Sequence, residues 1–447
     1  MSTKTFPGGV HPPEEKELSA HKAFERFPAP TTIVLPLSQH IGKASTPRVK
    51  KKDAVVPGQL IAEAEGFISA PIHSSIAGTV KSISREVNAG GFPKDAIVII
   101  PNGEEEPAEP EYFPPLPLDT ITPEQIRERV KEAGIVGQGG AAFPTFVKLT
   151  PPPDKEIDTV MINGCECEPY LTRDYRFMIE RPEAIAEGLR LIMLALGVKR
   201  GVFGIEDNKP DAIKAMEAAV QGMEGIEVAA LKTKYPQGAE KMLIKAVNGR
   251  EVPPGKLPLD VGVVIQNIGT AVAIYDSIAK GEPQITAALT VTGAGIKEPK
   301  NLIVPVGTPI TEVLEFCGGV TEDASKVIVG GPMMGVAQYD LAAPVMKATS
   351  GIVVLTKKEM RKQEETPCLR CGKCVDACPL HLVPTKLSRY SQLGRFEEAE
   401  ELGVTVCMEC GTCAFTCPAN IPLVQWLRLG KQEVMKLQRE RKAEQST

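Results

Sequence analysis

Near its C-terminus the chain reads Cys368-Leu-Arg-Cys371-Gly-Lys-Cys374-Val-Asp-Ala-Cys378-Pro379. The same spacing returns 39 residues later, as Cys407-Met-Glu-Cys410-Gly-Thr-Cys413-Ala-Phe-Thr-Cys417-Pro418. Together these two runs hold eight of the eleven cysteines. Three close cysteines on a tight turn can bind one face of an iron–sulfur cubane, and a more distant fourth cysteine closes the other face. The spacing therefore predicts a domain built around two [4Fe–4S] clusters.

In two-cluster proteins with this spacing, the fourth cysteine of each run binds the other run's cluster. We therefore predict two crossed ligand sets: Cys368, Cys371, Cys374 and Cys417 in one, and Cys407, Cys410, Cys413 and Cys378 in the other. Structural zinc is an alternative, but it is usually bound by two separated Cys-x-x-Cys pairs. Disulfides are another, but they need an oxidising compartment, and we expect no secretory leader. The clusters are favoured, which predicts a chain that moves electrons one at a time.

The composition limits the function classes that remain. The 447 residues include 51 basic and 56 acidic side chains, and this near balance argues against nonspecific nucleic-acid binding. Hydrophobic residues make up 43% of the chain, which is enough for sizeable cores. No window approaches the roughly 18 uninterrupted apolar residues of a membrane span. We therefore predict no transmembrane segment, so that any membrane association would run through partners.

The sequence predicts a multidomain α/β plus β protein with four parts. Residues 1–115 carry short β-like runs between Gly and Pro, and this part resembles the lipoyl/biotinyl barrel-sandwich fold. Such carriers present a lysine on a hairpin, whereas this chain reads Gly66-Phe-Ile-Ser-Ala-Pro71 there, so we expect an unmodified scaffold. Residues 116–284 alternate strand-like and helix-like stretches, which indicates an α/β domain.

The two remaining parts are predicted from their patterns of apolar residues. Residues 285–356 return to β patterns and would fit a β-grasp unit. Residues 357–447 surround the cysteine runs, and Leu387, Tyr390, Leu393, Phe396 and Ala399 recur there at helical spacing. A helical ferredoxin domain is therefore favoured over the small β-rich type.

Two loops in the α/β part are candidate binding elements. The first is the glycine-rich stretch 134–144, whose small residues let backbone amides approach a phosphate closely. It lacks the Gly-Lys-Ser/Thr of a Walker loop and does not follow a strand as a Rossmann fingerprint does, and a plain turn is the alternative. The second is Asn163-Gly-Cys-Glu-Cys-Glu-Pro-Tyr170, directly after a strand-like run.

Ligands of parallel sheets bind beyond the carboxyl ends of strands. The amide and carboxylates of the second loop could therefore contact a flavin or nicotinamide ring and ribose hydroxyls, although a solvated acidic loop is the alternative. We expect Cys165 and Cys167, within this loop, to bind no metal because no further Cys or His clusters nearby.

Long motifs resemble the RnfC family, a subunit of the Rnf electron-transport complex, which is a membrane-bound ferredoxin:NAD⁺ oxidoreductase. They are Gly134-Ile-Val-Gly-x-Gly-Gly-Ala-x-Phe-Pro-Thr145, Asn163-x-x-Glu166-Cys-Glu-Pro-Tyr170, Tyr235-Pro-Gln-Gly-Ala-Glu-Lys241, Gly249-Arg-Glu-Val-Pro253, Gln266-Asn-Ile-Gly-Thr270, Gly330-Gly-Pro-Met-Met-Gly335 and the cysteine runs. The opening Phe6-Pro-Gly-Gly-Val-His-Pro12 also looks like that family. The family is similar in turn to the flavin subunit of respiratory complex I, which binds FMN and NADH, and the 285–356 part resembles the SLBB-type β-grasp domain of that flavin subunit.

The resemblance implies where FMN and NAD(H) bind. It places the FMN phosphate at Gly137, Gly139 and Gly140 with Lys148 in reach, and the isoalloxazine near Asn163 and Glu166. Gln266, Asn267 and Thr270 would close the far side, Phe143 would stack on the nicotinamide nucleotide, and Glu168 would contact its ribose or amide. The chain departs from the complex I pattern at Gln138, Cys165 and Phe146, where that pattern has arginine, aspartate and glycine.

The resemblance also implies a function. Nicotinamide exchanges two electrons as hydride and a [4Fe–4S] cluster exchanges one, so a flavin is expected between them. No side chain is needed as acid or base, and no catalytic residue is predicted. The expected partners are NAD(H), the other subunits of a membrane-bound Rnf-type complex, and ferredoxin indirectly through one of them. The expected location is peripheral, on the cytoplasmic side of the membrane.

Two other functions are alternatives. One is a soluble FMN and iron–sulfur NADH dehydrogenase module, such as a cobalamin reductase or a hydrogenase-linked subunit. The other is an assembly scaffold with structural clusters and an empty α/β domain, which would take up no flavin.

Overall fold

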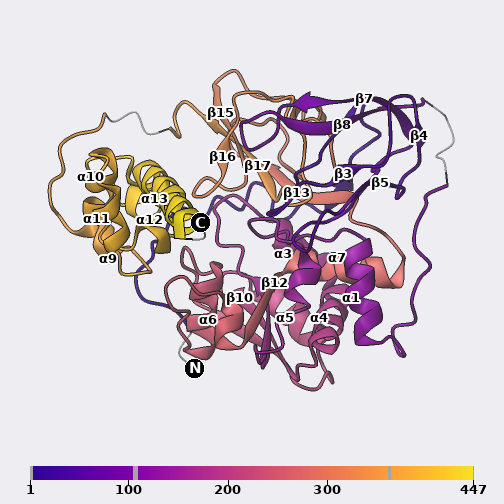
Figure 1. Cartoon of the computed structure of the whole chain (residues 1–447), viewed down its shortest axis with the longest axis horizontal. Coiled ribbons are helices and arrows are strands. Elements are labelled where there is room, and N and C mark those ends of the chain that lie inside the picture. The colour runs from indigo at the N-terminus through magenta and orange to yellow at the C-terminus, as the bar shows by residue number, and fades with distance from the viewer. Residues whose placement is uncertain (1–3, 104–108, 361–363, 446–447) are drawn as a thin grey trace.

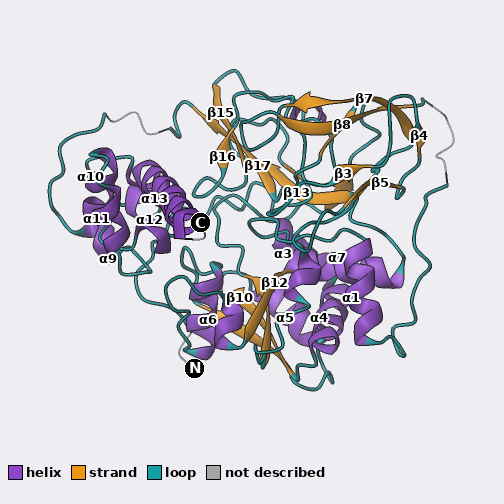
Figure 2. Ribbon diagram, in the orientation of Figure 1, coloured by secondary structure: helices purple, strands orange, loops and turns teal. Residues whose placement is uncertain are grey.

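The computed structural model describes residues 4–103, 109–360 and 364–445, and within them it shows the four expected parts. In Figure 1 the helical cysteine domain lies at the left, the α/β domain lies below, and the two β-rich parts lie above it. Figure 2 shows that helices dominate the cysteine domain and surround the sheet of the α/β domain, whereas strands and loops dominate the upper half.

The α/β domain contains a four-stranded parallel sheet. Its order is β11 (Ile226–Leu231), β10 (Arg200–Glu206), β9 (Thr159–Gly164) and β12 (Val263–Asn267). One face packs against α1 (Pro123–Glu132), α4 (Pro182–Leu196), α5 (Pro210–Ala219) and α7 (Ile268–Ala279), and the other against α6 (Glu240–Asn248). The short helices α2 (Thr145–Lys148) and α3 (Arg173–Glu180) follow the two candidate loops, and η1 (Pro258–Val261) precedes β12.

Local signals explain where these helices begin and end. Thr122 and Gln125 form both bonds of a capping box at the start of α1, which satisfies two N–H groups that the helix leaves unpaired. Helix α4 ends at Gly197, which adopts φ 68°. Glycine reaches this left-handed conformation without the steric cost of a Cβ atom.

The N-terminal β domain consists of two small sheets with a shared apolar core. One sheet has the order β2 (Ile33–Pro36), β8 (Lys94–Pro101), β7 (Gly78–Glu86) and β4 (Ala54–Val55). The other has the order β3 (Thr46–Pro47), β5 (Leu60–Glu63) and β6 (Ile72–His73). The hairpin region at residues 66–71 carries no lysine, as the sequence indicates.

The third part is a six-stranded mixed sheet with helix α8 (Ile310–Phe316). Its order is β1 (Phe24–Arg26), β14 (Lys300–Pro305), β13 (Thr286–Thr292), β17 (Gly351–Thr356), β15 (Ala324–Val329) and β16 (Val336–Ala337). Strand β1 pairs in parallel with β14 and so lies outside the N-terminal barrel. Nothing in the three residues of β1 signals a partner strand so far along the chain.

The cysteine domain is helical. It contains α9 (Lys373–Asp376), α10 (Pro384–Gln392), α11 (Phe396–Glu401), η2 (Val404–Val406), α12 (Thr412–Phe415) and α13 (Leu423–Gln445). Helix α13 packs its apolar residues Leu423, Val424, Leu427 and Val434 into the core of this domain. Within the described ranges, no helix combines the length and the apolar character that crossing a membrane requires.

We predict that Gly188→Ala destabilises the α/β domain. An added Cβ at Gly188 in α4 would lie 2.3 Å from the backbone oxygen of Ala271 in α7, so the two helices would have to separate. Overpacking of this kind costs about 2 kcal/mol in the free energy of unfolding, measurable by denaturant titration. Glu217→Ala on the exposed face of α5 is the control, and equal stability of the two variants would contradict the close packing.

Candidate functional site

The glycine loop forms a closed turn with exposed amides. The Gly137 N–H donates to the Phe143 carbonyl oxygen at 2.9 Å, and this bond closes the loop at its base. Gly139 and Gly140 are exposed at the tip, and an added Cβ at Gly140 would meet nothing within 4 Å. In the described part of the chain, the backbone N–H groups of residues 139–142 have no hydrogen-bond partner. Such a turn leaves several donors for one anion.

A buried polar network supports this loop from below. The Gln138 N–H donates to Thr270 Oγ1 at 3.0 Å, and the Arg173 guanidinium donates to the Gln138 carbonyl oxygen at 3.2 Å. Arg173 also donates to Asp174 Oδ1 at 2.6 Å and to Asn267 Oδ1 at 3.0 Å. Asn267 in turn donates from Nδ2 to Asp174 Oδ2 at 2.7 Å. Because each member is satisfied within the network, the loop's position is fixed.

The predicted residues at the ends of β9 and β12 lie side by side. Strands β9 and β12 pair so that Asn267 is opposite Asn163. The Asn163 amide donates to the Gly238 carbonyl oxygen at 2.7 Å and accepts the Cys165 N–H at 3.2 Å. A Cβ on Gly139 would lie 2.9 Å from the Asn267 side chain, so the glycine loop comes directly against this edge. The sheet edge and the loop therefore form one site.

The acidic loop after β9 is held together by Lys16 from the N-terminal segment. The Lys16 ammonium donates to the carbonyl oxygens of Glu166, Glu168 and Leu171 at 2.9, 2.9 and 2.6 Å. Burial lowers the pKa of Lys16, and the nearby Glu166 carboxylate opposes that change. One ammonium group therefore holds three carbonyl oxygens of the same loop.

The two carboxylates of this loop, Glu166 and Glu168, both accept hydrogen bonds from backbone N–H groups. Glu166 accepts the N–H groups of Asp174 and Tyr175 at 2.6 and 3.1 Å, which are the first turn of α3. A carboxylate is favoured there by the unpaired N–H groups and the helix dipole. Burial raises the pKa of Glu166, and Lys16 opposes that shift.

Glu168 instead joins two domains. Its carboxylate accepts the N–H groups of Met333 and Met334, in the β-grasp part, at 3.0 and 2.9 Å. It also accepts the Tyr235 hydroxyl at 3.4 Å. Glu168, which the resemblance assigned to the ribose or amide of the nicotinamide nucleotide, is therefore bound in a junction between two domains.

Lys148 and Gln266 lie beside each other at the end of β12. The Lys148 ammonium donates to Glu240 Oε1 at 2.7 Å and to the Ile265 carbonyl oxygen at 3.0 Å, so protein acceptors engage it. Gln266 is 2% exposed, and its Nε2 has no hydrogen-bond partner among the described residues. A buried unpaired amide is costly and points to a partner outside the chain.

Seven of the eight cysteines in the two runs fall into two groups that cross between runs. Burial raises the pKa of Cys374, and the neighbouring thiols of Cys417 and Cys368 add to the rise. Burial likewise raises the pKa of Cys413, with Cys410, Cys407 and Cys378 as its thiol neighbours. Within the described residues, no three His, Cys, Asp or Glu side chains are close enough together to hold a single metal ion. The thiols that bind a [4Fe–4S] cubane stand further apart, because they surround a core of several atoms.

The backbone repeats with the same 39-residue offset as the cysteines. Left-handed φ values occur at Arg370 and Glu409, at Gly372 and Gly411, and at His381 and Asn420. The Arg370 N–H donates to Cys368 Sγ, and the Glu409 N–H donates to Cys407 Sγ, both at 3.4 Å. Strained backbone at equivalent positions aims an amide at the first sulfur of each run.

The two groups differ in burial. In one predicted ligand set Cys368 and Cys371 are exposed, while Cys374 and Cys417 are buried. In the other set no cysteine is exposed: Cys378, Cys410 and Cys413 are buried and Cys407 is half-buried. The buried group faces the α/β domain, where the Tyr235 hydroxyl donates to the Cys410 carbonyl oxygen at 2.7 Å.

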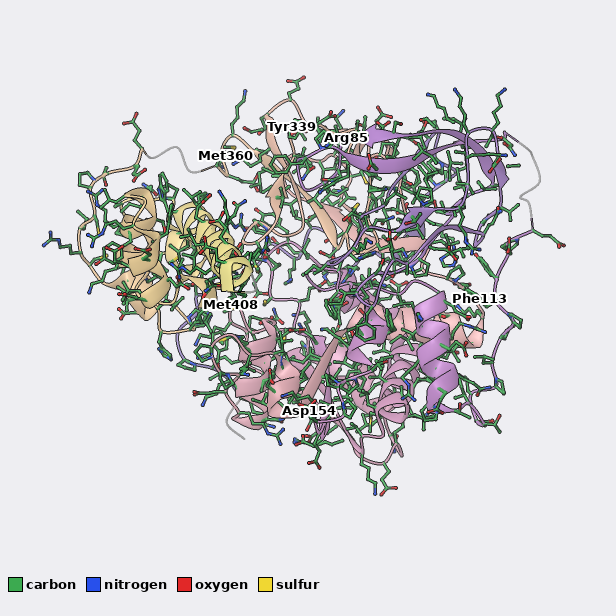
Figure 3. All side chains as sticks on the ribbon, viewed as in Figure 1. Arg85, Phe113, Asp154, Tyr339, Met360 and Met408 are labelled. Carbon is green, nitrogen blue, oxygen red and sulfur yellow. The ribbon has the colours of Figure 1, made fainter. Side chains whose placement is uncertain are left out.

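Around this contact, Val10, Tyr235, Ala377 and Cys410 form a small apolar cluster, with Cys167, Met333, Met408 and Phe415 packed against it. Figure 3 labels Met408 at the side of the cysteine domain that faces the rest of the molecule.

The N-terminal segment fastens this junction. The Gly9 N–H donates to the Ala377 carbonyl oxygen at 2.9 Å, and Val10 and Tyr235 exchange backbone hydrogen bonds. A Cβ on Gly8 would meet the Cys378 carbonyl oxygen at 3.0 Å. A segment that begins the chain therefore binds both the α/β domain and the cysteine domain.

Sequence reasoning identified the two loops and the cysteines but missed their supports. Lys16, Arg173, Asp174 and Tyr235 were not predicted as site residues. Arg173-Asp174 gives a weak signal, as adjacent opposite charges at the start of a short helix. Lys16 lies in the run Glu14-Glu-Lys-Glu17, which is typical of a solvated segment.

Family models match the four parts of the chain. They are the RnfC barrel sandwich hybrid domain over residues 4–104, the Nuo51 FMN-binding domain over 130–276, the SLBB domain over 289–337 and the 4Fe-4S dicluster domain over 360–434. The fold and the site therefore define an electron-transfer protein that carries FMN and two [4Fe–4S] clusters.

Curated relatives extend along nearly the whole chain. The RnfC-type subunit of the proton-translocating ferredoxin:NAD(+) oxidoreductase complex of Clostridium ljungdahlii is 46% identical, over 89% of this chain and 87% of its own length. Its counterpart in the Na(+)-translocating complex of Acetobacterium woodii is 46% identical, over 96% and 97%. The chain belongs to the RnfC family, whose members are subunits of ion-translocating ferredoxin:NAD(+) oxidoreductase complexes.

A solved structure shares the fold at lower identity. The NAD+-reducing [NiFe]-hydrogenase in the H2-reduced state has a TM-score of 0.50 and 18% identity, covering 72% of this chain and 62% of that one. At this identity the likeness concerns the fold alone.

The residues present fit both groups. The free amides of the glycine loop suit the FMN phosphate, and the unpaired Gln266 Nε2 suits a polar atom of the flavin. The crossed thiol groups, each with an N–H directed at a sulfur, suit two cubanes.

We predict that Lys16→Met disorganises the acidic loop and weakens FMN binding. The change leaves three carbonyl oxygens without their donor, which costs about 2–3 kcal/mol. FMN retention after gel filtration and the free energy of unfolding should both fall. Lys22→Met is the control, because Lys22 donates to one carbonyl oxygen at an exposed site. Full FMN retention by Lys16→Met would contradict this role.

Glu168 should make the stability of the protein depend on pH. Burial raises the pKa of Glu168 to about 7, above its unfolded value of about 4.3. Between these values the folded state holds a proton that the unfolded state has lost, so the Glu168 contribution to stability falls as pH rises. We expect the unfolding free energy of the wild type, relative to Glu168→Gln, to fall by about 3 kcal/mol from about pH 4.5 to about pH 8. A difference independent of pH would contradict a buried, titrating Glu168.

Proposed function

We propose that this chain is the peripheral subunit through which an ion-translocating ferredoxin:NAD⁺ oxidoreductase exchanges electrons with NAD(H). FMN supplies the conversion between hydride and single electrons, and the clusters supply one-electron transfer. The observation that carries the proposal is the Tyr235–Cys410 contact, which joins the loop beside the predicted flavin edge to a predicted cluster ligand. Of the candidate functions, the curated relatives favour this one over a soluble dehydrogenase module.

The crossed thiol groups are the proposed cluster ligands. An outer set consists of Cys368, Cys371, Cys374 and Cys417, and an inner set of Cys407, Cys410, Cys413 and Cys378. The exposed thiols of the outer set suit exchange with a partner subunit. The buried inner set lies against the α/β domain.

The FMN contacts are assigned from the hydrogen-bonding groups that have no partner within the protein. The amides around Gly139 and Gly140 would hold the phosphate, with Gly137 closing the turn. Asn163 and Gln266 would face the ring, and Asn267 and Thr270 would hold the glycine loop in place.

Lys148, Glu166 and Glu168 would act through other residues, because protein partners occupy their charged groups. Phe143 is half-buried beside the exposed amides and remains the candidate surface for the nicotinamide nucleotide.

The partners are proposed from chemistry and kinship together. The relatives are named as subunits of complexes, so other subunits of such a complex are the proposed binding partners, and ferredoxin would act through one of them. The proposed location is the cytoplasmic side of the membrane, held there by those subunits.

Anaerobic reconstitution of the full chain with FMN, iron and sulfide tests the proposal. NADH titration should bleach the flavin and then the clusters in the visible spectrum. Cys417→Ser should lose the outer cluster and keep NADH-dependent reduction of the inner one. Cys378→Ser should keep an outer cluster that NADH reduces at least tenfold more slowly, because the inner cluster is missing between it and the flavin domain.

Cys317→Ser, in the β-grasp core, is the matched control and should keep both clusters. Rapid NADH reduction in Cys378→Ser, with slow reduction in Cys417→Ser, would reverse the proposed order. A wild type that takes up no FMN would end the proposal.

A further inference from the structure

Lys347 is a buried lysine at the junction of three domains. It lies between strands β16 and β17 of the β-grasp part and is 2% exposed. Its ammonium group donates to the carbonyl oxygen of Pro71, which ends the hairpin region 66–71 of the N-terminal β domain, at 2.9 Å. It also donates to the carbonyl oxygen of Gly134, at the start of the glycine loop, at 2.7 Å. Burial lowers the pKa of Lys347 to about 7. Because a buried amine without acceptors is costly, the two carbonyl groups are held at hydrogen-bonding distance from it.

The same junction holds the first residues of the glycine loop. Gly134 adopts φ 64°, and an added Cβ there would lie 2.4 Å from the Pro71 carbonyl oxygen, so the hairpin region directly contacts the loop. Gln284, just before the β-grasp part, accepts the Val136 N–H at 2.8 Å and donates from Nε2 to the Lys347 carbonyl oxygen at 3.2 Å. Loop residues 134 and 136 are therefore hydrogen-bonded from outside the loop, just before its exposed amides begin.

The hairpin region also contacts the helix that follows the loop. The Phe67 ring packs edge-on against the Phe146 ring of α2, with centroids 5.6 Å apart and planes at 82°. The two ends of the loop lie side by side, because the Thr145 N–H donates to the Ile135 carbonyl oxygen at 2.9 Å. The hairpin region therefore contacts the base of the loop on both sides.

The hairpin region is itself fixed within the N-terminal β domain. Ser69 is fully buried, and its Oγ donates to the Lys43 carbonyl oxygen at 2.9 Å and accepts the Glu65 N–H at 3.0 Å. The Ala70 N–H donates to His40 Nε2 at 3.1 Å. A segment held in this way by its own domain gives the glycine loop a rigid surface to rest on.

We propose that the hairpin region 66–71, through Lys347 and Phe67, positions the glycine loop so that its amides bind the FMN phosphate. The inference rests on the proposed function, in that the FMN phosphate binds at this loop. Carriers with the lipoyl/biotinyl fold present a lysine at this hairpin, whereas here the hairpin contacts a neighbouring domain. Lys347 and Phe67 act through the loop backbone and α2, so both are positioning residues. Amides that are already aligned bind an anion more tightly than amides that must be ordered on binding.

The test compares FMN with riboflavin, which has the same ring system and lacks the phosphate. Dissociation constants for the full chain with its clusters are measured by anaerobic equilibrium dialysis. Lys347→Met keeps the length of the side chain and removes the donor. It should raise the dissociation constant of FMN about tenfold and that of riboflavin by less than about twofold, because the loss falls on the phosphate contacts.

Phe67→Ala is a second variant that should fold normally, because the Phe67 side chain is 59% exposed. It should raise the dissociation constant of FMN about threefold, which is the scale of one lost aromatic pair. The dissociation constant of riboflavin should again stay close to the wild-type value.

Each variant has a matched control. Ser75→Ala removes a hydrogen bond of 2.6 Å to the Val306 carbonyl oxygen, between the same two β-rich parts and away from the glycine loop. Phe92→Ala removes another exposed phenylalanine of the N-terminal β domain. Both controls should keep the wild-type ratio of the two dissociation constants.

If Lys347→Met folds and keeps the wild-type ratio, the proposal is overturned, even if the melting temperature of the variant falls. Equal weakening of both flavins also overturns it, because that result indicates a general loss of structure. If Lys347→Met does not fold, Phe67→Ala decides by the same ratio. A wild type that binds neither flavin would refute the proposed function instead.

Discussion

The ammonium group of Lys16 holds the loop on which the other domains converge. Its three hydrogen bonds to backbone carbonyls set the path of residues 166–171. That path includes left-handed backbone at Glu166 and Tyr170, which side chains adopt only when the surroundings enforce it. From this one loop, Glu166 caps α3, Glu168 reaches the β-grasp part, and Cys167 packs at the cysteine domain. A change in the loop would therefore alter contacts in three domains.

The consequence is a molecule whose redox site is an assembly of domain edges. The glycine loop is positioned by Arg173 and Thr270 through a buried network, and the sheet edge by Asn163. The cysteine domain docks through Tyr235 and the N-terminal segment. Each contact is polar and specific in geometry, so it fixes orientation more than it adds stability. Distance and orientation between cofactors are what a protein contributes to electron transfer.

The sequence predicted local features well because their causes are local. The strand before Asn163 and the helices between the two cysteine runs each follow from neighbouring residues, and the structure confirms them. Cysteine spacing likewise carries its ligand chemistry within eleven positions.

Long-range features could not be read in the same way. Strand β1 pairs with a strand about 275 residues away, and Lys16 contacts carbonyls about 150 residues away. The roles expected for Glu166 and Glu168 followed from their position in a motif. A motif records which residues are needed and does not say which neighbour each one contacts, and in the structure both carboxylates meet backbone N–H groups.

The cysteine domain shows how two nearly identical half-sites can differ. The halves share cysteine spacing, left-handed positions and an N–H directed at the first sulfur at 3.4 Å. These shared features give the two clusters no reason to differ in potential. Burial, charge and one side-chain contact differ, because Thr412 Oγ1 lies 3.4 Å from Cys410 Sγ where the first run has Lys373.

Arg370 is exposed beside the outer thiols, whereas its counterpart Glu409 is paired with Arg428 and Lys431 of α13, each at 3.0 Å. The long helix that closes this domain thus neutralises a carboxylate next to the inner set. This charge pairing contributes to any difference in potential between the clusters, so α13 is part of the redox apparatus as well as of the core.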